Sequence, residues 1–231
     1  MGKLYLVSTP IGNLEDITIR AKRVLSEVPI IACEDTRKTG LLLKILQIER
    51  KAELVSYFEE NELRRIPEII NLLKDGKDVA LVSNAGTPTI ADPGFKLVRE
   101  CIKNGLEVIS IPGASALLSS LVCSGLPTDK FIFLGYLPKK LGKRKMALKN
   151  LATVLQSMVA SVIIYESPYR ILKTLADLRD VFGDIEIVLG RELTKFYEEK
   201  IRAKISEVEE RFRKKKPKGE LTLLFNLGSA N

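Results

Sequence analysis

Residues 79–94 of the chain read V-A-L-V-S-N-A-G-T-P-T-I-A-D-P-G, an apolar run followed directly by a loop of small and turn-forming residues. The run has the length of a buried strand, and a helical pattern begins after Pro93. Because ligands bind outside the carboxyl ends of parallel strands, such a loop predicts a ligand site. A plain surface turn that caps the following helix explains the same residues equally well.

The loop lacks the signatures of the common nucleotide sites. A dinucleotide fingerprint needs G-x-G-x-x-G and a phosphate loop needs Gly-Lys-Ser/Thr, and residues 83–94 contain neither. We therefore expect a ligand other than a nucleotide phosphate.

Helical patterns separate the apolar runs of the first half. Expected strands lie at residues 3–7, 30–32, 54–56, 79–82 and 108–111. Between them, Ile66, Ile69, Ile70 and Leu73 fall at helical spacing before Gly76, which indicates a helix with an apolar face. This alternation predicts an α/β domain with a parallel sheet.

The pattern changes after P-G-A-S-A at residues 112–116. A helix is expected through residues 117–122, followed by strands at 131–134, 162–165, 185–189 and 221–225 with fewer clean βα repeats. We expect an N-terminal α/β domain over 1–112 and an α+β domain over 113–231, with a ligand cleft between them.

Composition narrows the class of protein. The 231 residues are 45% hydrophobic with a formal charge of +8, which fits a globular protein with a polyanionic partner. The three cysteines are widely spaced, so we expect neither a disulfide framework nor a zinc site. No signal segment and no apolar run near the roughly 20 residues of a membrane span occur, so we expect a cytoplasmic protein without a membrane partner.

The chain contains no histidine. This excludes Ser-His-Asp triads, Cys-His dyads and imidazole bases. We expect no metal ligands, and proton handling must use carboxylates, Lys, Tyr, Cys or solvent.

Two basic segments stand out. The first, K-K-L-G-K-R-K, follows an expected strand, and we expect five of its cations to contact the phosphate backbone of a nucleic acid: Lys139, Lys140, Lys143, Arg144 and Lys145. For the second, at residues 211–218, a solvated face is as good an explanation as a binding surface.

Six motifs appear in order: T-P-I-G-N-L-E-D-I at 9–17, E-D-T-R at 34–37, the loop at 83–94, P-G-A-S-A, Y-E-S-P-Y-R at 165–170 and G-R-E-L-T-K at 190–195. Together they resemble the ribosomal RNA small subunit methyltransferase I family of the tetrapyrrole methylase superfamily. The resemblance implies a two-domain fold and transfer of a methyl group from S-adenosylmethionine to the ribose 2′-hydroxyl of a decoding-centre cytidine. It also implies small-subunit ribosomal RNA or the assembled subunit as partner, and a homodimer.

The resemblance further implies a set of cofactor-binding residues from both domains. These are Asn84, Gly86, Thr87, Ser115, Ala116, Tyr165, Glu166, Leu193, Gly219, Glu220 and Leu221. Helix capping explains Ser115 and Ala116 as well, and core packing explains Leu193.

Two positions depart from the family pattern. The family usually has Asp at the position of Asn84 and His at that of Tyr169. Asn keeps the hydrogen-bond geometry but carries no charge. Tyr excludes a pH-sensitive role near neutrality.

A ribose hydroxyl needs an acceptor within about 3 Å or a stabilised alkoxide. The candidates at strand ends are Glu34, Asp35, Arg37 and Lys195. We expect Asp35 to orient the hydroxyl or accept its proton, Arg37 to hold a flanking phosphate, and Lys195 to stabilise negative charge. Asp35 as a helix cap, with Arg37 in an ion pair, is an equal alternative.

Two other functions stay open from the sequence. A tetrapyrrole methyltransferase would share the cofactor motifs but would not need the basic segment at residues 139–145. A noncatalytic RNA-binding ribosome-assembly protein would need the basic segments but not the cofactor motifs.

Overall fold

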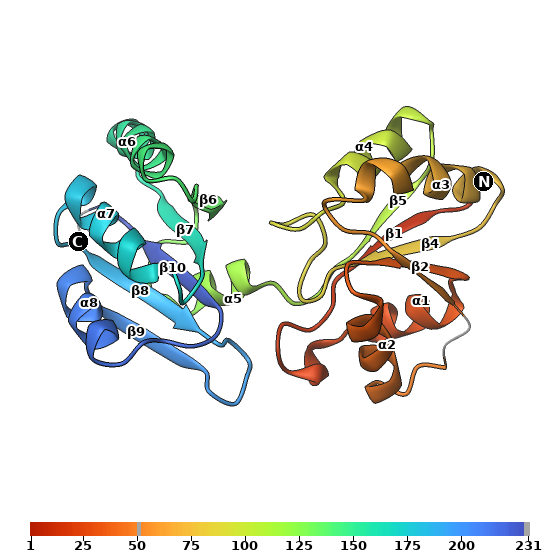
Figure 1. Ribbon diagram of the computed structural model, residues 1–231, viewed down its shortest axis with the longest axis horizontal. Coiled ribbons are helices and arrows are strands. Elements are labelled where there is room, and N and C mark those ends of the chain that lie inside the picture. The colour runs from red at the N-terminus through yellow and green to blue at the C-terminus, as the bar shows by residue number, and fades with distance from the viewer. Residues whose placement is uncertain (50–51, 229–231) are drawn as a thin grey trace. The chain divides into compact units, whose positions relative to one another are not determined.

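The computed structural model describes residues 1–49 and 52–228. The chain divides into two compact units, Met1–Ser115 and Ala116–Asn231. The division falls a few residues after the domain boundary expected at Pro112. Each unit has its own sheet (Figure 1). Separate clusters of buried side chains form the cores of the two units.

A parallel sheet in the order β3-β2-β4-β1-β5 forms the N-terminal unit. Its strands are β1 (Leu4–Val7), β2 (Ile30–Cys33), β3 (Glu53–Ser56), β4 (Val79–Val82) and β5 (Val108–Ile111). All four of its strand pairs are parallel, as expected from the alternating sequence pattern. Every residue of β2 and β4 is buried, because helices cover both faces of the sheet.

Helices cover the two faces in pairs (Figure 1). The helices α1 (Ile19–Glu27) and α2 (Thr36–Ile45) pack on one face, and α3 (Glu62–Lys74) and α4 (Phe95–Lys103) pack on the other. A short 3₁₀ helix, η1 (Leu14–Asp16), precedes α1. The change of face between the two pairs places the ends of β1 and β4 side by side at the switch point of the sheet, the usual ligand position in such folds.

The C-terminal unit has a mixed sheet in the order β6-β7-β10-β8-β9. Its strands are β6 (Phe131–Tyr136), β7 (Ser161–Glu166), β8 (Glu186–Arg191), β9 (Glu199–Lys204) and β10 (Leu221–Phe225). The pair β6 and β7 is parallel, and β10 lies antiparallel between β7 and β8. This α+β organisation confirms the expectation for the second half.

Three helices cover one face of the mixed sheet: α6 (Leu141–Ser157), α7 (Ile171–Phe182) and α8 (Ile205–Lys214). The short α5 (Ala116–Val122) packs on the other face through Leu117 and Leu121. None of the helices in the described part of the chain has the length and apolar character that a membrane crossing requires.

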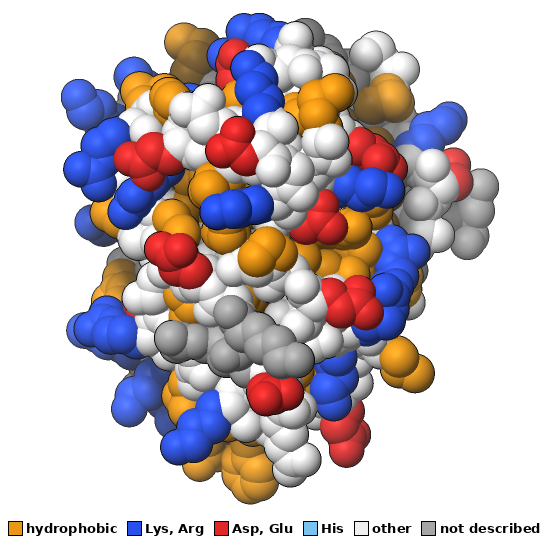
Figure 2. Space-filling view, turned by 90° about the vertical axis from the view of Figure 1, so that its right-hand side faces the viewer, with side chains coloured by type: hydrophobic (Ala, Val, Ile, Leu, Met, Phe, Trp, Pro, Cys, Tyr) orange, Lys and Arg blue, Asp and Glu red, His pale blue; other side chains and the backbone are white. Residues whose placement is uncertain are grey.

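Charged side chains of both signs share the surface. On the face in Figure 2, Lys and Arg side chains lie among Asp and Glu side chains, with hydrophobic side chains between them. A basic surface must therefore be identified from cations without carboxylate partners rather than from the net charge of +8.

Candidate active site

Three loops meet at the carboxyl ends of β1, β4 and β5 in the N-terminal unit. Thr9 and Gly86 exchange backbone hydrogen bonds of 2.9 and 3.0 Å. The Ser8 hydroxyl donates to Thr87 Oγ1 at 3.1 Å, and the Thr87 hydroxyl donates to the carbonyl of Ala114 at 3.2 Å. The structure thus brings Gly86 and Thr87, both predicted from the sequence, next to the segment that contains Ser115.

Backbone strain is concentrated in two loops. Among the described residues, positive φ angles at non-glycine positions occur at Gln47, Thr89, Ala91, Glu192 and Thr194. All except Gln47 lie in the loop after β4 or in the loop after β8. Because side chains rarely adopt this conformation without a functional reason, the strain favours the ligand-site interpretation of residues 83–94 over a plain turn.

The loop after β4 also carries an unsatisfied polar atom. Asn84 Oδ1 is buried and has no hydrogen-bond partner among the described residues. Gly86 has a φ of +81°, and an added Cβ would lie 3.3 Å from Ile11 Cγ2 and 3.8 Å from the Ala114 carbonyl oxygen, so the position suits glycine. A buried acceptor beside a glycine fits a ligand that brings its own donor.

The acidic residues after β2 accept hydrogen bonds from backbone N–H groups. Glu34 Oε2 accepts a long hydrogen bond of 3.4 Å from the backbone N–H of Asn84. Asp35 caps α2, because its Oδ1 accepts from the backbone N–H of Arg37 at 2.9 Å and of Lys38 at 3.4 Å. Helix α2 begins at Thr36, so the capping alternative for Asp35 is confirmed.

Arg37 and Asp35 form a pair of side chains. Arg37 Nη2 lies 3.0 Å from Asp35 Oδ2, and Arg37 Nε lies 3.2 Å from Oδ1. The Arg37 side chain, together with the backbone N–H groups, lowers the pKa of Asp35 from 3.8 to about 2. A carboxylate with so low a pKa is a weak base but a good hydrogen-bond acceptor.

In the C-terminal unit, Tyr165 and Glu166 hold neighbouring elements in place. The Tyr165 hydroxyl accepts from the backbone N–H of Leu117 at 3.0 Å, which ties β7 to the start of α5. Glu166 is 1% exposed. Its carboxylate accepts from Thr174 Oγ1 at 2.5 Å and from the N–H of Ser167 at 2.7 Å. The side chain of Glu166 is thus occupied within the unit.

A second unsatisfied polar atom lies near the end of β8. Ser120 Oγ is buried and has no hydrogen-bond partner in the described ranges. A Cβ on Gly190 would lie 3.4 Å from Ser120 Oγ and 3.2 Å from Leu193 Cδ2. Leu193 is 8% exposed, which agrees with the core-packing alternative. Nothing in the sequence marks Ser120, which lies within an apolar helix.

The loop after β8 joins residues that are far apart in sequence. Lys195 Nζ lies 2.9 Å from Glu192 Oε1 and 2.8 Å from Glu220 Oε2. The backbone N–H of Glu220 donates to the same Glu192 oxygen at 3.0 Å. A Cβ on Gly219 would collide with the Glu192 carboxylate. The structure thus brings Lys195, Gly219 and Glu220 together, and adds Glu192, to which the sequence analysis gave no role.

The basic segment 139–145 requires a correction. Arg144 is 4% exposed, and its Nε lies 2.6 Å from Asp177 Oδ2, so the expectation that it contacts RNA is wrong. A guanidinium in the middle of a basic run is buried here because a carboxylate on α7 and the carbonyls of Pro138 and Lys139 bind it. Lys139, Lys140 and Lys143 are exposed.

Lys145 is partly exposed and pairs with Asp180, with its Nζ 2.8 Å from Asp180 Oδ2. This ion pair raises the pKa of Lys145. Its positive charge is compensated within the unit, so Lys145 is a weaker candidate for a phosphate contact than the three exposed lysines.

Comparison with known proteins shows which family the chain resembles. The sequence pattern of the family described as "Tetrapyrrole (Corrin/Porphyrin) Methylases" matches residues 3–209. A Thermotoga maritima protein named "Ribosomal RNA small subunit methyltransferase I" is 49% identical over 98% of this chain and 99% of that protein. A protein of the same name from Hydrogenobaculum is 49% identical over 97% of this chain and 95% of that protein.

The chain belongs to the ribosomal RNA small subunit methyltransferase I family, within the tetrapyrrole methylases. The resemblance drawn from the six sequence motifs is confirmed. As a member of this family it is a methyltransferase that uses S-adenosylmethionine.

Solved structures agree on the fold. The chain matches a uroporphyrin III C-methyl transferase of Thermus thermophilus, complexed with S-adenyl homocysteine, with a TM-score of 0.66 at 21% identity over 96% of this chain and 97% of that one. It matches the methyltransferase CobJ with a TM-score of 0.72 at 16% identity over 100% and 97%. At these identities the likeness shows the two-domain fold alone.

The described residues fit S-adenosylmethionine. In the N-terminal unit, Asn84 Oδ1 is a buried polar atom with no partner in the described part of the chain. A cofactor that carries amino and hydroxyl groups satisfies such atoms. A Cβ on Gly86 or Gly190 would come into close contact with a neighbouring side chain, so the backbone approaches its surroundings closely at both positions. Asn84, Gly86 and Thr87 are the residues of the N-terminal unit that would hold the cofactor.

Proposed function

We propose that this methyltransferase acts on the ribose 2′-hydroxyl of a cytidine in the decoding centre of small-subunit ribosomal RNA. The observation that carries the proposal is the 49% identity, over nearly the whole of both chains, to a protein named for small-subunit ribosomal RNA. Lys139, Lys140 and Lys143 are exposed and have no ion-pair partner in the described ranges, which agrees with a polyanionic substrate.

The cofactor supplies a methyl group on a positively charged sulfur. The residues of the chain must then align the acceptor oxygen and balance charge as it moves. Loops of small residues such as 83–87 serve the first task, because small side chains let a ligand approach the backbone closely. Charged side chains near the strand ends serve the second.

Asp35 suits an orienting role better than that of a general base. Its pKa of about 2 leaves little affinity for a proton. Its Oδ2 receives only the Arg37 Nη2 hydrogen bond in the described structure, and a carboxylate oxygen has room for a second donor. We therefore assign to Asp35 acceptance of a hydrogen bond from the ribose hydroxyl, which leaves the proton to solvent as the methyl group arrives.

Arg37 and Lys195 suit the cationic roles. The Arg37 side chain is 90% exposed, and the donors of Nη1 are free of any described partner, so it can contact a phosphate next to the methylated nucleotide. Lys195 uses two of its three donors on Glu192 and Glu220. The third donor is available to an oxygen that becomes negative, and the two carboxylates help to raise the pKa of Lys195, which keeps it charged.

Two further features complete the proposal. We place the protein in the cytoplasm with its ribosomal substrate, and we propose that it works as a homodimer. Sedimentation velocity of the full chain tests the assembly state, since a single species of monomer mass over the working concentrations contradicts the dimer.

Methyl transfer itself is tested with tritium-labelled cofactor. Small-subunit RNA, or assembled subunits, from a strain that lacks the modification should accept the label, and mass spectrometry of the digested RNA should find it as 2′-O-methylcytidine. Label on a base, or transfer only to a tetrapyrrole offered in parallel, contradicts the proposal.

A further inference from the structure

The segment 215–219, which lies between α8 and β10, carries cations without carboxylate partners in the described part of the chain. Lys215, Lys216 and Lys218 are exposed, and no ion pair joins them to a carboxylate in the described part of the chain. By contrast, Lys214 on α8 pairs with Glu210 at 2.6 Å. The three lysines of the segment are therefore available to an anionic partner.

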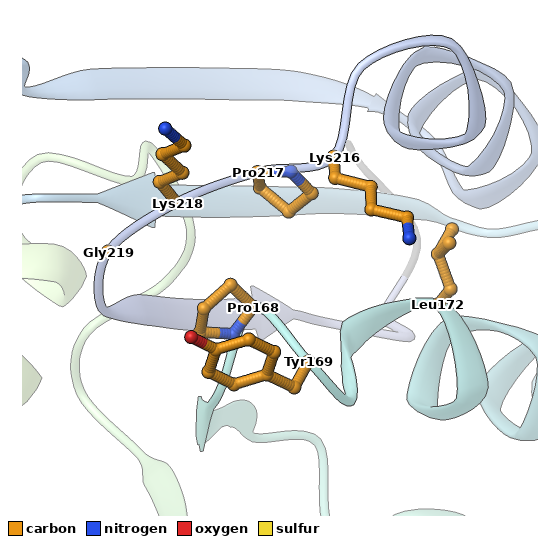
Figure 3. Close-up of a pocket in the computed structure, with 7 residues that line it drawn as sticks. All are labelled: Pro168, Tyr169, Leu172, Lys216, Pro217, Lys218 and Gly219. Atoms are coloured by element: carbon orange, nitrogen blue, oxygen red, sulfur yellow. The ribbon is translucent and has the colours of Figure 1, made fainter.

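A hollow of about 520 Å³ lies on one side of this segment (Figure 3). It is lined by Pro168, Tyr169, Leu172, Lys216, Pro217, Lys218 and Gly219. Figure 3 shows the ring of Tyr169 next to Pro168, while the side chain of Lys216 reaches toward Leu172. Tyr169 is 92% exposed, although an aromatic ring usually packs against other side chains.

A second hollow of about 620 Å³ shares the same segment. It is lined by Arg191, Tyr197, Glu199, Arg211, Phe212, Lys214, Lys215, Lys216, Pro217 and Lys218. The ring of Tyr197 in this lining is 69% exposed and packs edge to face against the exposed Phe196. The lining contains a single carboxylate, Glu199, among its many cations.

The arginines of the second hollow hold the segment in place. Arg191 Nη1 donates to the carbonyl of Lys218 at 3.1 Å, and Arg191 Nε lies 2.9 Å from Glu199 Oε2. Arg211 pairs with the other oxygen of Glu199. The carboxylate is thus occupied by arginines, which leaves the lysines of the segment uncompensated.

We infer that this surface binds a single-stranded stretch of RNA, with phosphates on Lys215, Lys216 and Lys218 and bases stacked on Tyr169 and Tyr197. The inference rests on the proposed function only in taking RNA as the substrate. Cations that follow a backbone, next to exposed aromatic rings, are the features by which proteins bind single strands. The bases of a duplex are paired and cannot reach the two rings.

The first test measures how the affinity depends on salt. The probe is a fluorescein-labelled oligocytidine of about 12 nucleotides, and its binding to the full chain is followed by anisotropy. The affinity falls as salt rises, so the slope of log affinity against log salt is negative. Replacing Lys215, Lys216 and Lys218 by Ser should make this slope shallower by about 2, because three phosphate contacts are lost. The matched control replaces the exposed Lys22, Lys44 and Lys77 of the N-terminal unit and should keep most of the slope.

The second test separates stacking from charge. Tyr169→Ala and Tyr197→Ala should each weaken oligocytidine binding by about 5- to 100-fold, whereas Tyr169→Phe and Tyr197→Phe should bind nearly as well as the parent. Because Tyr169 is so exposed, its substitution should leave the melting temperature unchanged. A double-stranded RNA of the same length should compete poorly.

The inference is overturned if the lysine and alanine variants bind the oligocytidine as tightly as the parent at every salt concentration. It is also overturned if the variants change only the sedimentation of the protein, which would make the surface a contact between copies of this chain. Tritium transfer by the parent chain is measured alongside. Normal transfer with unaffected RNA binding refutes this surface and leaves the proposed function intact.

Discussion

The amide oxygen of Asn84 is an unpaired buried acceptor among the described residues, which makes it the most informative atom of the N-terminal loop. An unsatisfied buried polar group costs stability, and a ligand that donates a hydrogen bond to this oxygen would remove that cost. Asn at this position supplies that acceptor without a negative charge.

Substitution of Asn84 tests this interpretation. Asn84→Leu should leave the free energy of unfolding unchanged or raise it by about 1 kcal/mol, because the unpaired group is removed. It should weaken S-adenosylmethionine binding by about tenfold, as measured by calorimetry. The matched control is Asn61→Leu, since Asn61 Oδ1 accepts from the N–H of Phe58 at 2.9 Å. That variant should lose stability and keep its cofactor affinity, and the opposite pattern contradicts the ligand role.

Gly86 and Gly76 form a natural pair for a second experiment. Their φ angles are +81° and +85°, but a Cβ on Gly76 meets no atom within 4 Å. Gly86→Ala and Gly76→Ala should both lose about 1–2 kcal/mol of unfolding free energy through backbone strain. Only Gly86→Ala should also weaken cofactor binding. Equal cofactor affinities in the two variants would reduce Gly86 to a turn residue.

Asp35 should give the folded protein a distinctive acid response. Its pKa is about 2 in the folded chain against an ordinary value of 3.8, so its carboxylate contributes stability above pH 3.8 and loses that contribution as the pH falls toward 2. Asp35→Asn keeps a capping oxygen but lacks the Arg37 ion pair. Its melting temperature should therefore lie below that of the parent at neutral pH and converge with it near pH 2.

The same variant distinguishes the two catalytic roles. If Asp35 orients the hydroxyl, single-turnover methylation by Asp35→Asn should fall by less than the roughly hundredfold loss typical of a removed general base. A loss well beyond that magnitude, at unchanged cofactor affinity, would return the base role to Asp35.

A buried ion pair joins α6 to α7. The side chains of Arg144 and Asp177 are 5% and 6% exposed. Asp177→Ala should cost about 3–5 kcal/mol in urea unfolding, because it leaves a buried charge without its partner. The double variant Arg144→Met with Asp177→Leu should recover most of that stability. Arg144→Met should not alter the salt dependence of RNA binding, and a change there would restore Arg144 as an RNA contact.

The sequence predicts most elements because their apolar pattern is local. The run at residues 79–82 predicts β4 with its observed bounds, and the runs at 108–111 and 221–225 do the same for β5 and β10. Strand β9, with the sequence E-K-I-R-A-K, is missed. Only Ile201 within it is buried, as befits an edge strand of the sheet.

The sequence predicts those parts of the candidate site that short motifs mark. The strained loops are located by G-T-P-T-I-A-D-P-G and G-R-E-L-T-K, whose positions need no tertiary information. The contact between Glu192 and Gly219 depends on the pairing of β8 with β10, which brings together residues far apart in the chain. The burial of Arg144 likewise depends on Asp177, so its charge alone is misleading.

At the scale of the whole molecule, the cysteines distinguish the two units. Cys33 and Cys101 are fully buried in the separate core clusters of the N-terminal unit, and burial raises the pKa of Cys101 to about 11. Cys123 in the C-terminal unit is partly exposed. A chromogenic disulfide reagent should therefore modify Cys123 in the folded protein and reach the other two only on unfolding.

Cys123→Ser supplies the control for this experiment. That variant should show no rapid modification, and its slow phase should then report the opening of the N-terminal unit alone. Rapid modification of two or more thiols in the folded parent would contradict the buried positions of Cys33 and Cys101.

The sheet order of the C-terminal unit has a consequence for synthesis on the ribosome. The central strand of that sheet, β10, is the last strand of the described chain, whereas all strands of the N-terminal unit precede residue 112. During translation the N-terminal sheet can assemble as soon as β5 emerges. The other sheet must wait, with the edges of β7 and β8 uncovered, until residues 221–225 arrive to join them. The nascent enzyme therefore passes through a stage in which one half is folded and the other exposes unpaired strands, when it is most vulnerable to aggregation and most in need of a chaperone.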